Sequence, residues 1–64
     1  MKNDAYSVIS EAKNFVENSS ISYSEKENIQ NLINSLEDAI NSSDGTIIKT
    51  YTIKLRNSLL NLLD

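Results

Sequence analysis

The sequence predicts an all-α protein, built as an antiparallel, up-down-up bundle of three helices over about residues 4–17, 22–41 and 45–63. Apolar residues recur at steps of three and four in each range, which is the period of a helix with one buried face. No proline interrupts the chain. Two short polar segments separate the ranges, and such short connections make consecutive helices antiparallel neighbours.

The first predicted helix starts at about Asn3 or Asp4 and ends at about Glu17. Asp4 suits the start because the helix dipole favours negative charge there. The polar run over residues 18–20 ends the helix. The apolar stripe consists of Ala5, Val8, Ile9, Ala12, Phe15 and Val16.

The second predicted helix carries the clearest stripe, six apolar residues within about 120° of the helix circumference. Its start is ambiguous, because Ser22 with Glu25 and Ser24 with Glu27 both fit the capping-box pattern. The spacing is compatible with either serine as the N-cap. The stripe consists of Ile29, Leu32, Ile33, Leu36, Ala39 and Ile40.

The third predicted helix follows a turn over residues 42–45, with Asp44 as its expected N-cap. A strand over residues 46–53 is the competing interpretation, because Ile, Thr and Tyr are dense there. Alternation fails at residues 47–48, however, and no second strand is available to pair with it, so we prefer the helix. Its stripe consists of Ile48, Tyr51, Thr52, Leu55, Leu59 and Leu62, with Leu63 at the edge.

Length and composition exclude several classes of function. Sixty-four residues make one small domain, residues 1–64, with little core to spare for a pocket. The chain has no Cys and no His, so thiolate metal sites and the commonest general base are lacking. A net charge of −3 argues against nucleic-acid binding, and no apolar run is long enough for a membrane span or signal peptide. We therefore expect a soluble, cytoplasmic domain that is not an enzyme.

Two carboxylate pairs are the candidate acid–base groups, Glu25 with Glu27 and Glu37 with Asp38. Paired carboxylates catalyse only when a pocket gives the two groups different environments. The first pair lies at a helix start, where the dipole favours negative charge, and the second points away from the apolar stripe. We expect solvated charge at both, and no catalytic, cofactor-binding or metal-binding residues.

Two apolar residues of the third helix, Ile53 and Leu60, do not fit its stripe. They lie seven residues apart, well away from the centre of the core face. One interpretation is scattered surface hydrophobes or a broader core. The other is a docking seam, for another domain of a longer protein or for a second copy of the chain in weak self-association. Lys49 and Arg56 share one flank of this helix, but two cations do not make a phosphate-binding stripe.

Three segments of the chain carry a resemblance to a known family: residues 4–15, the helix start over residues 21–29, and residues 36–40 with Asp44, Ile48, Lys49, Thr52 and Leu55. In this order they resemble the C-terminal helical lid of the 70-kDa heat-shock (DnaK-type) chaperones. The start of the chain also resembles the iron–sulphur-assembly (HscA-type) branch of that family, where a similar Ala-x-x-Val-Ile run occurs. Two departures lie around the second turn: Gly45 and Ile47 replace a larger residue and an Ala, and Asn-Ser-Ser replaces the usual Gly before Asp44.

This resemblance implies a lid that closes over a β-sandwich domain of the same parent chain and slows the escape of unfolded client polypeptides. It selects Ser22 as the cap of the second helix. ATP would bind in a separate domain of the parent protein, so no cofactor is expected in this chain. No latch residue is carried over, because the family's latch lies mainly upstream of Met1. The alternative function is a free-standing three-helix protein-binding or adaptor module.

Overall fold

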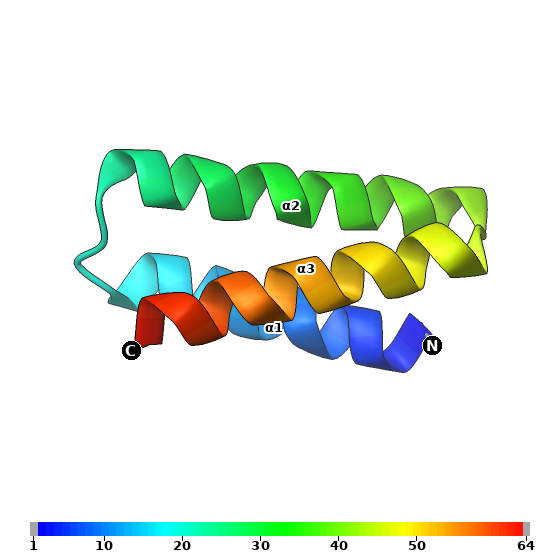
Figure 1. Ribbon diagram of the computed structural model, residues 1–64, viewed down its shortest axis with the longest axis horizontal. Helices are drawn as coiled ribbons and strands as arrows, with labels where there is room; N and C mark the ends of the chain where they lie inside the picture. The colour runs from blue at the N-terminus through cyan, green and yellow to red at the C-terminus, as the bar shows by residue number, and fades with distance from the viewer. Residues whose placement is uncertain (1, 64) are drawn as a thin grey trace.

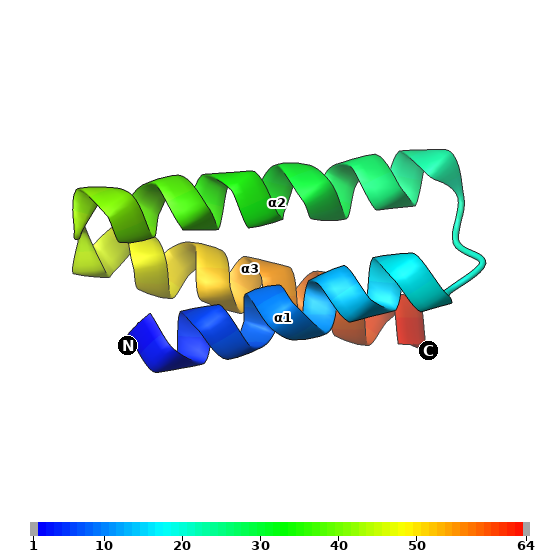
Figure 2. The same cartoon turned by 180° about the vertical axis from the view of Figure 1, so that it is seen from behind.

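Three α-helices form the computed structural model, which describes residues 2–63: α1 (Lys2–Asn18), α2 (Tyr23–Ser42) and α3 (Gly45–Leu63). The described side chains are those of residues 3–62, so the expected position of Leu63 at the stripe edge lies outside them. Figures 1 and 2 show α2 running antiparallel to both α1 and α3, with the start of α1 and the end of α3 at opposite ends of the bundle. All three helix pairs are in contact. The predicted all-α three-helix bundle is confirmed, and the strand alternative over residues 46–53 is wrong.

The buried core draws on all three apolar stripes, which meet along the bundle axis. Phe15, Val16, Leu32, Tyr51 and Leu62 pack against this core while partly exposed, as expected of stripe edges. The buried members are Ala5, Val8, Ile9 and Ala12 from α1, Ile29, Ile33, Leu36, Ala39 and Ile40 from α2, and Ile48, Leu55 and Leu59 from α3.

Thr52 is the one buried polar residue among the described side chains. Its hydroxyl donates to the Ile48 carbonyl one turn earlier at 2.7 Å. This bond satisfies the hydroxyl without a partner from another helix, so the threonine can sit in an apolar face at little cost.

Ser22 is the N-cap of α2, and Ser24 lies within the first turn. The Ser22 Oγ accepts from the Glu25 amide at 3.2 Å, and Glu25 Oε1 accepts from the Ser22 amide at 3.0 Å. Two backbone N–H groups that the helix start would leave unpaired are thus satisfied together.

The second connection is tighter than the expected four-residue turn, because Ser42 ends α2 and Gly45 begins α3. Ser43 takes the left-handed conformation, with φ 57° and ψ 30°. Its amide donates to the Ile40 carbonyl at 3.1 Å, and the Asp44 amide donates to the Ala39 carbonyl at 3.4 Å, the bond pattern of a Schellman motif. Asp44 Oδ1 then accepts from the amides of residues 46 and 47, which caps α3.

Candidate functional site

A groove runs along the side of the bundle where α1 and α3 lie next to each other. It has two depressions, of about 350 Å³ and 130 Å³, and Arg56 lines both of them. The larger depression is lined by Asp4, Lys49, Thr52, Ile53 and Arg56, and the smaller by Glu11, Phe15, Arg56, Leu59 and Leu60.

Ile53 and Leu60 stand on the α3 wall of this groove, one in each depression. Their exposed fractions are 46% and 54%, so neither belongs to a broader buried core. Tyr6, Tyr23 and Ile47 are the other exposed large apolar residues of the described chain. Ile53 and Leu60 differ from these three because they share one helix face at a spacing of seven residues.

Charged residues of opposite sign occupy the two walls. Asp4 and Glu11 lie on the α1 wall, and Lys49 and Arg56 lie on the α3 wall. All four residues are exposed. Among the described side chains, the one ion pair within 4.0 Å is instead Lys13 with Glu37, at 3.6 Å on the opposite side of α1.

The acidic wall is the part of this site that sequence reasoning missed. Asp4 was expected only at a helix start, and Glu11 carried no expectation. The sequence does contain an indication of this wall, because Asp4 and Glu11 are seven residues apart, as are Lys49 and Arg56. Equal spacings on two helices become informative only once the helices are known to lie next to each other.

Lys54 lies apart from the two groove cations. Its Nζ sits 5.1 Å from the centre of the Tyr51 ring, a cation–π contact. Both residues line a different depression, between α2 and α3. The α3 wall therefore carries two cations at heptad spacing rather than a cluster of three.

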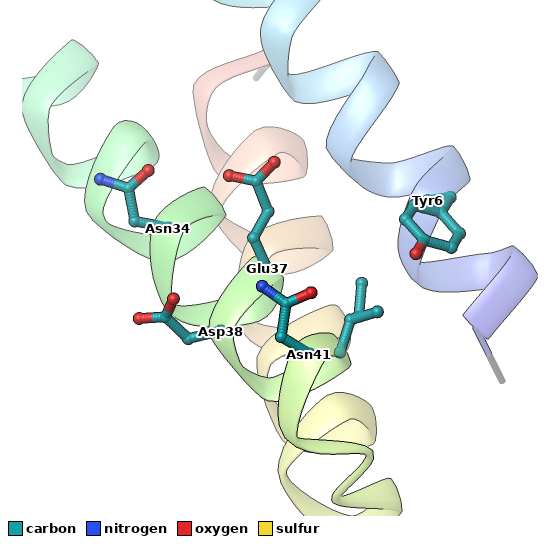
Figure 3. Close-up of a pocket in the computed structure, with 6 residues that line it drawn as sticks. Tyr6, Asn34, Glu37, Asp38 and Asn41 are labelled. Carbon is teal, nitrogen blue, oxygen red and sulfur yellow. The ribbon is translucent and has the colours of Figure 1, made fainter.

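A second, more polar groove lies between α1 and α2. Figure 3 shows Tyr6 projecting from α1, while the other labelled side chains project from α2. Glu37 is engaged by Lys13 from α1, and Glu25 of the other candidate acid–base pair is engaged in the cap of α2. The lining residues are Tyr6, Asn34, Glu37, Asp38, Ile40 and Asn41.

The described residues contain no group of three carboxylates placed to hold a metal ion. Within residues 2–63 no helix combines the length and the apolar character that crossing a membrane requires. Comparison with known protein families, curated proteins and solved structures finds no match to this chain.

Proposed function

We propose that this chain is a non-catalytic helical module that docks onto another protein surface through its α1/α3 groove. The observation that carries the proposal is the exposure of Ile53 and Leu60 on one face of α3, one in each depression of the groove. Exposed apolar residues that cluster on one face, with polar residues around them, are typical of protein interaction sites. Singly exposed residues such as Tyr23 need no such explanation.

Composition supports a binding role over a chemical one. A chain without His or Cys would have to rely on carboxylates, Lys, Ser, Thr or Tyr for catalysis. The carboxylates of both candidate pairs are used in a helix cap or an ion pair, or project into solvent. A small three-helix core also loses stability if a pocket is opened within it.

The specific form that we propose is the lid of a DnaK-type chaperone, acting in the cytoplasm. Its support is the resemblance of the segments around Ser22, Asp44 and Ile48, together with the three-helix arrangement. In this proposal the partner is the β-sandwich domain of the same parent chain, and unfolded clients are held indirectly. ATP would act in a separate domain, and the iron–sulphur-assembly branch is the form suggested by the chain's start.

A free-standing binding or adaptor module is the second candidate, and the same exposed pair supports it. The coding region upstream of Met1 separates the two. A lid requires upstream nucleotide-binding and β-sandwich domains in the same reading frame. If that reading frame lacks them, the lid proposal fails, and the free-standing module remains.

A substitution in the full-length parent tests the surface itself. Ile53→Lys with Leu60→Lys should raise the dissociation rate of a bound, unstructured client peptide, because closing a lid acts mainly on dissociation. Ile47→Lys is the matched control, since Ile47 is 42% exposed on the same helix but does not share the face of the pair. Equal dissociation rates for the parent and the double variant would contradict the proposal.

A further inference from the structure

The α1/α3 groove carries three rows of side chains that repeat every seven residues. The acidic row is Asp4 with Glu11, the basic row is Lys49 with Arg56, and the apolar row is Ile53 with Leu60. A step of seven residues along a helix is about 10.5 Å. Because α1 and α3 run in the same direction, the rows repeat in parallel (Figure 2).

The rows are also level with one another along the groove. Asp4 lines the same depression as Lys49 and Ile53, and Glu11 lines the same depression as Leu60. Arg56 lies between them and lines both. The groove thus presents the same unit twice, an acidic wall facing a wall that is both basic and apolar.

Its floor is apolar where the two helices meet. Leu59 is buried, Phe15 is partly buried, and the hydroxyl of Thr52 is already satisfied by its own helix. A segment bound in the groove therefore contacts an apolar floor, whose one hydroxyl already has a hydrogen-bond partner, and two walls of opposite charge. Such a surface favours an element with one apolar edge and two differently charged flanks.

We propose that this groove binds an amphipathic α-helix of a partner protein, which completes a four-helix bundle. The bound helix carries acidic residues on its flank over α3 and basic residues on its flank over α1. This inference rests on the proposed docking function and specifies the kind of partner. Its apolar edge repeats every three and four residues and packs on Ile53, Leu60 and the groove floor.

The seven-residue repeat is the reason for a helix rather than an extended strand. A helix repeats its own side chains at the same rise, whereas a strand places them on one face every 6 to 7 Å, about two residues. The side chains on one face of a strand would therefore not coincide with the successive residues of each row. Mixed charge on the walls likewise disfavours an anionic membrane surface or a nucleic acid, which both require one sign.

Charge also disfavours a second copy of the chain as the occupant. An antiparallel two-fold arrangement of this face sets each row opposite its own equivalent, acidic against acidic and basic against basic. A parallel two-fold arrangement pairs unlike rows, but it sets one groove against another and fills neither. A single helix avoids both conflicts.

A titration of the isotope-labelled chain with designed peptides tests the inference. The probe peptide has three heptads, with Leu along one edge, Glu along one flank and Lys along the other. Two matched peptides carry Glu on both flanks or Lys on both flanks. Amide chemical shifts should change along the groove when the probe peptide binds. Both matched peptides should bind about tenfold more weakly, because one flank of each then lies over a wall of like charge, where two attractions become two repulsions.

The orientation of the bound peptide gives a second readout that apolar attraction alone would not produce. Exchanging the Glu and Lys flanks should make the peptide bind in the reverse direction. A spin label at the peptide N-terminus broadens the resonances of nearby residues in the chain. This broadening should then shift from residues at one end of the groove to residues at the other. The charge-exchanged chain, carrying D4K, E11K, K49E and R56E, should reverse the direction for each peptide.

The outcomes separate this inference from the docking function. Equal affinities for the three peptides, shifts on the outer face of α2, or no binding would overturn the helical partner. Concentration-dependent mass that depends on Ile53 and Leu60, without peptide binding, would make a second copy the occupant. If the double lysine variant still alters client release when no peptide binds, the docking function stands and the helical partner does not.

Discussion

Ser22 and Glu25 satisfy each other's backbone at the start of α2, through bonds of 3.2 Å and 3.0 Å in opposite directions. The same Glu25 oxygen also accepts from the Ser22 hydroxyl at 2.9 Å. These bonds hold the start of the middle helix, which contacts both others.

Replacing Ser22 by Ala should lower the free energy of unfolding by about 1 kcal/mol, the usual cost of losing an N-cap. Ser24→Ala is the matched control, since Ser24 fits the same sequence pattern but lies inside the helix, where Ala is favoured. Urea denaturation of the two variants measures the difference. Equal losses would show that the cap contributes nothing specific.

The left-handed backbone conformation of Ser43 predicts that a glycine at this position stabilises the protein. A residue with a Cβ pays about 1 kcal/mol for this conformation, and Gly does not. Ser43→Gly should therefore raise the free energy of unfolding by roughly 0.5–1 kcal/mol. Ser42→Gly, one residue earlier and helical, should lower it by about the same amount. Thermal unfolding followed by circular dichroism tests both, and opposite signs are the expected result.

Core and groove leucines should respond very differently to truncation. Leu36 is fully buried, so Leu36→Ala should cost about 2–5 kcal/mol, comparable to the whole stability of a domain this small. Leu60 is more than half exposed, and Leu60→Ala should change stability by less than about 0.5 kcal/mol. Chemical denaturation provides the measurement, and a large loss at Leu60 would place it in the core instead.

Thr52→Val should leave the bundle as stable or slightly more stable. The Thr52 hydroxyl bonds only to the carbonyl of its own helix, which keeps its backbone partner when the hydroxyl is removed. Valine has nearly the same shape and adds apolar area to the core. The midpoint of urea unfolding is the readout, and a loss above about 1 kcal/mol would reveal a role for the hydroxyl that this bond does not explain.

The double variant Ile53→Lys with Leu60→Lys should keep the helical circular dichroism spectrum and abolish any self-association of the chain. Both side chains are exposed, and lysine is a good helix former, so the fold loses little. Sedimentation at several concentrations measures the mass. Loss of the helical spectrum would contradict the assignment of these residues to the surface.

Much of the fold followed from local pattern. The six-residue stripe over residues 29–40 predicted one buried face, and five of its members are buried while Leu32 lies at the edge. Helix ends shifted by one or two residues, since Lys2, Asn18 and Ser42 are helical beyond the predicted limits. The exact residue at which a helix ends depends on a few terminal hydrogen bonds rather than on the periodicity of its apolar residues.

The candidate site was only half predictable. Ile53 and Leu60 stood out from the stripe of α3 by their spacing alone. Their acidic neighbours Asp4 and Glu11 each lie 49 residues earlier in the chain, on another helix. Periodicity gives the angle of a side chain about its own helix but does not say which neighbour that angle faces.

The sequence by itself determined three helices, their apolar faces and the two polar connections, because these depend on spacing within about twenty residues. Tertiary structure alone decided how the third helix turns against the first two. An up-down-up bundle can place its third helix on either side of the first pair, and both arrangements bury the same stripes. The observed arrangement turns the flank with Ile53 and Leu60 toward α1, so that the acidic row of α1 faces the basic row of α3 across the groove.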